Sequence, residues 1–230
     1  MKKSCLLIKI FLIAFSFTII FSIIIFQIFY RCLDKYNDTR LDPLRMPEIK
    51  IDTAKKYDYV LIGDSHVQYW STGNNSLNLG MTGQTSEQIK LKYLLLKDEI
   101  KSGKKLIISV GANDVKSIAT NPGNKEEIIK KCVENLQLII SENKNKFDRI
   151  YVITIPPDFQ VSFPYNFINY EDTFTSKLKI NEEIRKTALK NKIGLIDTYE
   201  IFKNKTGNEY SIDGVHMNVI AYKILNEKIR

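Results

Sequence analysis

Five short segments of the chain have the composition of β-strands, and the first four stop at a glycine or a proline. They span residues 58–62, 76–79, 106–110, 150–155 and 193–196, with stops at Gly63, Gly80, Gly111 and Pro156. Between them lie stretches whose apolar residues recur every three or four positions, the spacing of one helix face. Strands alternating with helices predict a parallel sheet covered by helices on both faces. The continuous apolar run at 106–110 should lie at the centre of that sheet.

The predicted helices span residues 86–99, 128–140, 178–189 and 219–229. Thr85 and Gln88 form a capping box at the start of the first one, and Ile89 begins its apolar face. Cys132 falls on the apolar face of the second helix, so we interpret it as a core residue and not as a nucleophile. A chain of 230 residues is long enough for one α/β domain and a small appendage. We expect the domain at residues 57–230.

The N-terminal part has the composition of a membrane span. Residues 10–30 contain no charged side chain, and as a helix they would cover roughly 30 Å, the thickness of a bilayer core. Bulky residues stand where signal peptidase needs small ones, which favours an uncleaved anchor at residues 1–30 surrounded by membrane lipid. A lipid-modified Cys32 is an alternative that its neighbours Tyr30 and Arg31 disfavour.

Residues 31–56 are polar, contain Pro43 and Pro47, and lack helical or strand periodicity, so they are interpreted as a tether. Basic residues flank the apolar segment on both sides and leave its orientation open. We expect a single-pass protein of the cell membrane with a short cytoplasmic tail and an external domain.

The charge and cysteine patterns exclude several function classes. The net charge is +8, but basic and acidic residues are interspersed, which favours a solvated surface over a nucleic-acid partner. Cys5 and Cys32 lie at opposite ends of the apolar helix and Cys132 stands alone, so no disulfide is expected. Two histidines and no Cys/His cluster predict no metal site, and the absence of a phosphate-binding glycine loop predicts no cofactor. The oligomeric state stays open.

Two strings near opposite ends of the chain supply the groups of a nucleophilic mechanism. Ser65 follows the first strand, and Asp213 precedes His216 by three residues in a glycine-containing loop. A serine needs a base to take its proton, and the base needs a third group to orient it. Ser65, His216 and Asp213 can fill these roles, although a turn serine and a surface Asp-His pair are ordinary features by themselves.

Two further strings add oxyanion donors. Asn78 to Gly83 follows the second strand, and Gly111 to Asp114 follows the third. Ser65, Gly80, Asn113 and His216, in this order and each in its own block, resemble the SGNH hydrolase family of GDSL-like esterases and lipases. The resemblance covers the domain from about Tyr57 onward and omits the anchor and tether.

The resemblance implies a flavodoxin-like three-layer α/β/α fold and a serine esterase mechanism. Ser65 would be the nucleophile, His216 the general base and Asp213 its orienting carboxylate. The backbone amides of Ser65 and Gly80 and the side chain of Asn113 would form the oxyanion hole. His66 stands where the family pattern has leucine, and we interpret it as a pocket or surface residue.

These features predict a membrane-anchored serine esterase whose substrate is an acyl ester, most simply an acetyl ester on a cell-surface carbohydrate. An O-acyltransferase acting on a surface glycan would use the same catalytic groups. A lipid esterase, or a catalytically silent glycan-binding protein on this fold, would also be consistent with these residues.

Overall fold

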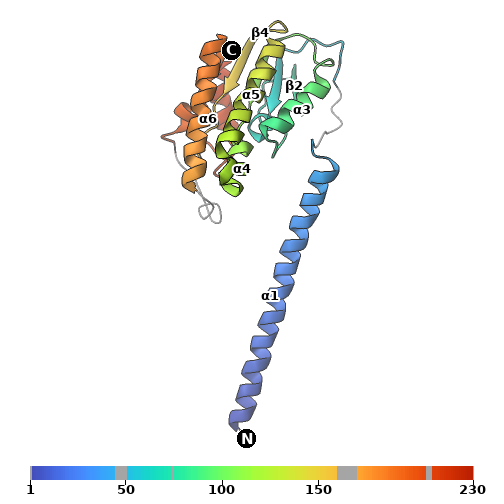
Figure 1. Ribbon diagram of the computed structural model, residues 1–230, viewed down its shortest axis with the longest axis vertical. Coiled ribbons are helices and arrows are strands. Elements are labelled where there is room, and N and C mark those ends of the chain that lie inside the picture. Colours follow the sequence, from blue (N-terminus) through green and yellow to red (C-terminus); the bar gives the residue numbers. More distant parts are fainter. Residues whose placement is uncertain (1, 45–50, 74, 160–169, 206–208, 230) are drawn as a thin grey trace. The chain divides into compact units, whose positions relative to one another are not determined.

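The computed structural model describes residues 2–44, 51–73, 75–159, 170–205 and 209–229 (Figure 1). It divides into two units, Met1–Arg45 and Met46–Arg230. The first unit contains one long helix, α1 (Lys2–Leu41), and the second is an α/β domain. The boundary at residue 57 and the tether remain predictions, and residues 45–50 of that tether lie outside the described residues.

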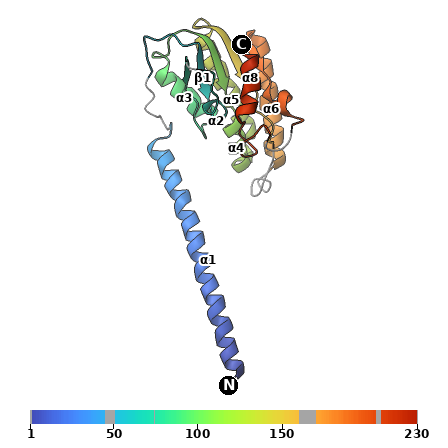
Figure 2. The same cartoon turned by 180° about the vertical axis from the view of Figure 1, so that it is seen from behind.

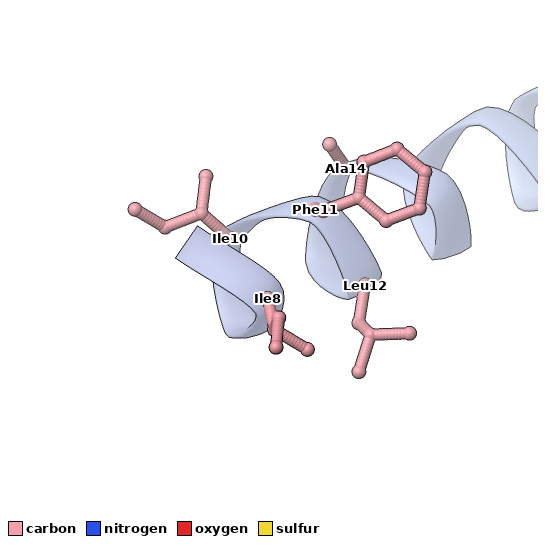
Figure 3. A pocket seen from close by; sticks show the side chains of 5 residues that line it. All are labelled: Ile8, Ile10, Phe11, Leu12 and Ala14. Carbon is pink, nitrogen blue, oxygen red and sulfur yellow. The ribbon is translucent and has the colours of Figure 1, made fainter. Parts of the chain in front are cut away.

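Helix α1 contains the apolar segment found in the sequence. Its stretch Ile8–Arg31 is long and apolar enough to cross a membrane, and as an N-terminal helix it could be an anchor or a signal sequence. Figure 3 shows the described side chains that line a hollow on this helix, and all of them are apolar: Ile8, Ile10, Phe11, Leu12 and Ala14.

The helix continues past the predicted end of the anchor at residue 30, so residues 31–41 are helical where irregular chain was expected. That stretch contains neither glycine nor proline, and the helix stops shortly before Pro43, whose ring disfavours helical geometry in the preceding residues.

The domain is built on one parallel sheet. Its strands are β1 (Tyr59–Gly63), β2 (Ser76–Asn78), β3 (Gly103–Ser109), β4 (Phe147–Ile153) and β5 (Gly194–Ile196), in the order β2-β1-β3-β4-β5. All four strand pairs are parallel. This order is the flavodoxin-like arrangement. The parallel sheet and the central place of the 103–109 strand are therefore confirmed.

Helices cover both faces of the sheet, which makes three layers. Figure 1 shows one face with α3 (Ser86–Leu96), α4 (Ala112–Thr120), α5 (Lys125–Asn143) and α6 (Tyr170–Asn191), and Figure 2 shows α8 (Val219–Lys228) on the other. Strand side chains alternate between the two cores: Leu106 and Ile108 of β3 face the first group, while Ile107 faces the second. The second core also contains residues of α2 (Ser65–Gln68) and α7 (Thr198–Phe202).

The predicted helices are confirmed with adjusted ends. The first ends at Leu96, three residues earlier than expected, and the Gln88 side chain accepts the Thr85 N–H of its capping box at 3.0 Å. Helices α4 and α7 were not predicted, because such short segments place too few residues on the core to give a visible period. Cys132 is 1% exposed, and burial raises the pKa of its thiol well above the ordinary value, so it is a core residue.

Candidate active site

Ser65 lies in the turn between β1 and α2, at the carboxyl edge of the sheet. β1 ends at Gly63, Asp64 caps α2, and Ser65 is the first residue of that helix, as the sequence predicts. The Asp64 side chain accepts the His66 N–H at 2.9 Å. Asp64 is 0%, Ser65 4% and His66 2% exposed, so the turn belongs to the interior of the domain.

His216 and Asp213 come from the loop before α8 and meet the serine. His216 Nε2 lies 2.9 Å from Ser65 Oγ, and His216 Nδ1 lies 2.6 Å from Asp213 Oδ2. With a proton held at Nδ1 by the carboxylate, Nε2 is free to accept the serine proton. The structure thus brings the predicted nucleophile, base and carboxylate into one continuous chain of contacts.

Asp213 also stabilises its own loop. Its Oδ1 accepts the backbone N–H groups of Val215 and His216 at 3.0 and 2.8 Å. Burial by itself raises the pKa of Asp213, but the hydrogen bonds from His216 and Val215 outweigh it and lower that pKa to about 2. The carboxylate therefore stays charged at neutral pH, as an orienting group beside an imidazole must.

Ser211 supports the same loop and was not identified from the sequence. Its Oγ accepts the Gly214 N–H at 2.7 Å and donates to the His216 carbonyl at 2.9 Å. Ile212 N–H donates to that carbonyl as well, also at 2.9 Å. A serine five residues before a histidine carries no recognisable signal in the sequence, so only the folded loop reveals this role.

The ring of the second histidine, His66, lies beside the ring of His216. The rings of His66 and His216 are 5.7 Å apart, and Tyr69 packs edge-on against His216 at 5.4 Å. Burial, with help from the nearby His216, lowers the pKa of His66 to about 3. His66 is therefore neutral, and its Nδ1 has no hydrogen-bond partner in the described part of the chain. The structure therefore places His66 in the interior of the domain and not on its surface, and its interpretation as a pocket residue stays a prediction.

Gly80 follows β2 and lies against α2. A Cβ atom on Gly80 would come within 2.3 Å of Gln68 N, so no side chain fits there. The Gly80 N–H donates to the Asn78 side chain at 2.9 Å, a bond that the sequence did not predict. An oxyanion at this position would share the Gly80 N–H with Asn78 Oδ1.

Asn113 is the second residue of α4 and is 7% exposed. Its Nδ2 donates to the Gln84 carbonyl at 2.9 Å. A side-chain amide carries two protons, so this bond leaves one for a ligand. Its neighbour Asp114 accepts both the N–H and the hydroxyl of Ser86 at the start of α3, which makes Asp114 a structural residue.

The described residues contain no group of three or more His, Cys, Asp or Glu side chains that could hold a metal ion.

Comparison with known proteins identifies the domain. The sequence model of the GDSL-like Lipase/Acylhydrolase family matches residues 61–224, while no curated protein matches the chain. A crystal structure of a GDSL-like lipase from Bacteroides thetaiotaomicron is 20% identical, covers 84% of this chain and 94% of its own, and has a TM-score of 0.59.

An acetylxylan esterase from Geobacillus stearothermophilus is 17% identical, covers 78% of this chain and 94% of its own, and has a TM-score of 0.56. At these identities the structural likeness establishes the fold, while the family match covers most of the sequence. The chain belongs to the GDSL-like Lipase/Acylhydrolase family and is a serine hydrolase that acts on ester bonds.

Proposed function

We propose that this protein is a membrane-anchored esterase that removes acetyl groups from cell-surface carbohydrate by a Ser-His-Asp mechanism. The observation that carries the proposal is the unbroken set of contacts from Ser65 Oγ through His216 to Asp213. An unrelated serine and histidine would not be expected to lie 2.9 Å apart while a carboxylate contacts the other nitrogen of the histidine ring.

The reaction would begin with transfer of the Ser65 proton to His216 Nε2 while Oγ attacks the ester carbonyl carbon. Asp213 would stabilise the imidazolium that forms. His216 would then donate the proton to the leaving alcohol, and an acyl group would remain on Ser65. A water molecule activated by the same histidine would release the acid and restore the serine.

The negative charge on the carbonyl oxygen would be stabilised by the oxyanion donors. We assign this role to the N–H groups of Ser65 and Gly80 and to the Asn113 side chain. The second Nδ2 proton of Asn113 supports the assignment, and Gly80 would act while still bonded to Asn78. Each donor of this kind is worth roughly 3 kcal/mol of transition-state stabilisation.

The substrate class is inferred from location and from one structural neighbour. An apolar helix retained as an anchor would restrict the domain to esters near the membrane, and an external domain would meet surface polymers. The Geobacillus neighbour acts on acetylated xylan, a carbohydrate ester. Acetyl esters of surface carbohydrate are the substrate that fits both.

The activity test uses the full chain in detergent with 4-nitrophenyl acetate and an acetylated oligosaccharide. We expect Ser65→Ala to abolish release of acetate and covalent labelling by a fluorophosphonate. Ser141→Ala, at an exposed site on α5, is the matched control and should keep both. Turnover retained by Ser65→Ala would rule out the mechanism, and transfer of acetyl to a sugar without release of acetate would identify a transferase.

The location test needs a cysteine on the outside of the domain. Lys144 is exposed at the end of α5, whereas Cys132 is buried. Lys144→Cys should react with a membrane-impermeant maleimide on intact cells, and the chain should keep its first 31 residues in the membrane fraction. Labelling only after lysis would contradict an external domain, and a shortened soluble product would indicate a cleaved signal sequence.

A further inference from the structure

Tyr69 lies one helical turn after Ser65, at the end of α2. Its backbone N–H donates to the Ser65 carbonyl at 3.2 Å, and residues four positions apart lie on one face of a helix. The Tyr69 ring is 5.4 Å from the ring of His216, and the two planes are nearly perpendicular, at 86°. Tyr69 therefore stands beside the proposed general base, on the side of α2 that carries the nucleophile.

The Tyr69 ring is open to solvent, although the next residue is not. Tyr69 is 48% exposed, whereas Trp70 is 2% exposed and packs in the second core. Because the planes of Tyr69 and His216 are perpendicular, His216 does not stack on the tyrosine, and no other ring among the described residues packs against it. An aromatic face beside the active site is thus available to a ligand, and covering it would remove apolar area from water.

Polar groups lie next to this ring at its hydroxyl end. Tyr69 Oη lies 3.4 Å from Thr82 Oγ1, and the Gln68 side chain accepts the Thr82 N–H at 2.6 Å. An apolar face with hydroxyl and amide groups at its edge matches a sugar ring, which has C–H faces and hydroxyl groups around its rim. A hydrocarbon chain has no group that this polar edge could bind.

The proposed mechanism brings the alcohol portion of the substrate to the same place. His216 Nε2 has to donate its proton to the leaving oxygen, which requires a distance of about 3 Å between the two atoms. The carbonyl oxygen of the ester occupies the oxyanion donors at that time. The group attached to the leaving oxygen therefore lies beside the His216 ring, where the Tyr69 ring also lies.

We propose that Tyr69 stacks on the sugar ring that carries the acetyl ester, and that the enzyme thereby prefers pyranose alcohols to acyclic ones. This inference rests on the proposed function and names the form of the alcohol in its substrate. Tyr69 is a specificity-determining residue in this account, because it contacts the substrate and takes no part in proton transfer.

The test measures kcat/KM of the full chain in detergent on three acetyl esters that differ in the shape of the alcohol. They are acetylated methyl xylopyranoside, acetylated xylitol and hexyl acetate, which offer a ring, an open polyol and a hydrocarbon chain. We expect the wild-type enzyme to prefer the pyranoside. Tyr69→Ala should lower kcat/KM on the pyranoside about tenfold, mainly through KM, and on the xylitol ester by less than about twofold.

Three further variants keep the test decisive. Tyr69→Phe keeps the ring and should keep most of the preference for the pyranoside. Tyr69→Leu keeps apolar bulk without a flat face, so it should lose the preference, and it replaces Tyr69→Ala if that variant folds poorly. Leu189→Ala is the matched control, because it removes an apolar side chain that is 83% exposed near the end of α6, and it should leave the preference unchanged.

The inference fails if Tyr69→Ala lowers kcat equally on all three esters, since Tyr69 would then only position His216. It also fails if the wild type shows no preference for the pyranoside, or if Tyr69→Ala affects hexyl acetate most, which would indicate a lipid alcohol. All these results leave the Ser-His-Asp mechanism intact as long as hydrolysis depends on Ser65. Failure of the proposed function would look different, because wild type and Ser65→Ala would then be equally inactive on every ester.

Discussion

The two halves of the proposed catalytic triad are held in place in different ways. The turn Gly63–His66 is buried, and β1 before it pairs with β3 along its whole length from Tyr59 to Gly63. The loop from Tyr210 to Asn218 lies near the surface, and the Asp213 side chain is 50% exposed. The serine therefore depends on the central sheet, and the histidine depends on a loop outside it.

Hydrogen bonds between residues close in sequence hold most of that loop in its conformation. The contacts of Asp213 and Ser211 join residues no more than five positions apart. Met217 anchors the loop in the second core, and the Gly214 carbonyl accepts the Phe159 N–H from the segment after β4. Changes in the turn should thus affect folding and activity together, whereas changes in the polar side chains of the loop should affect activity with little effect on folding.

His216→Ala is expected to have the largest effect and to separate activity from folding. Loss of the general base should lower kcat by roughly 10⁴ to 10⁶-fold. The thermal midpoint should shift by less than about 3 °C, because the His216 side chain is not part of either apolar core. Steady-state hydrolysis of 4-nitrophenyl acetate and a melting curve by circular dichroism give the two values.

Ile220→Ala, at an exposed position on α8, is the control and should preserve both activity and melting. A large fall in the melting temperature of His216→Ala would mean that the His216 side chain contributes to the stability of the domain, and the contrast between the two regions would be lost.

The Gly80→Ala substitution tests the buried turn that carries Ser65. The new methyl group would lie 2.3 Å from Gln68 N and 2.7 Å from Gln68 Cα, both backbone atoms of α2. The helix that begins with Ser65 would have to move, and we expect a loss of about 1 to 3 kcal/mol in the free energy of unfolding together with reduced kcat. Gly123→Ala has open space around the added methyl and should change neither. Normal stability with normal activity in Gly80→Ala would show that α2 is not fixed as tightly as its burial implies.

Asp64 in the turn and Asp213 in the loop should make the stability of the folded protein depend on pH in opposite directions. The folded-state pKa of Asp64 is raised from 3.8 to about 7, so the folded protein holds a proton that the unfolded chain has lost. Its contribution to stability is present below pH 4 and falls as pH rises toward 7. The folded-state pKa of Asp213 is lowered from 3.8 to about 2, so its contribution is present above pH 4 and is lost as pH falls toward 2.

Melting temperatures of the wild type, Asp64→Asn and Asp213→Asn from pH 2 to 8 test this contrast. The difference between wild type and Asp64→Asn should change between pH 4 and 7, and the difference for Asp213→Asn should change below pH 4. Parallel curves for Asp64→Asn and the wild type would show that the buried carboxyl is not protonated in the folded protein.

The difference between turn and loop also explains what the sequence could predict. The strands and their stops are local signals, and the order of a parallel sheet follows from alternation, so the central strand and the position of Ser65 could be predicted. His216 and Asp213 could be found because histidine is rare and the two residues are close in sequence.

Contacts between residues far apart in the sequence, and single side-chain hydrogen bonds, have no recognisable pattern in the sequence. The bond between the Gly80 N–H and Asn78 depends on how the chain turns after β2, and the role of Ser211 depends on a bridge to Met217. The pairing of Lys177 with Asp158 joins α6 to the irregular segment after β4. These contacts could be identified only in the folded structure.

Ser211→Ala should have the smallest effect, and it tests how much the loop relies on one short-range support. Removing the hydroxyl takes away the donor to the His216 carbonyl and the acceptor for the Gly214 N–H. Asp213 still holds the histidine backbone and ring, so we expect kcat to fall only about three- to tenfold, with KM little changed, because a slightly misplaced base slows proton transfer without altering binding. Ser211→Thr keeps the hydroxyl and should recover most of the lost rate if the added methyl is accommodated. If Ser211→Ala lowered kcat as much as His216→Ala does, the conformation of the loop would depend on Ser211 and not on Asp213.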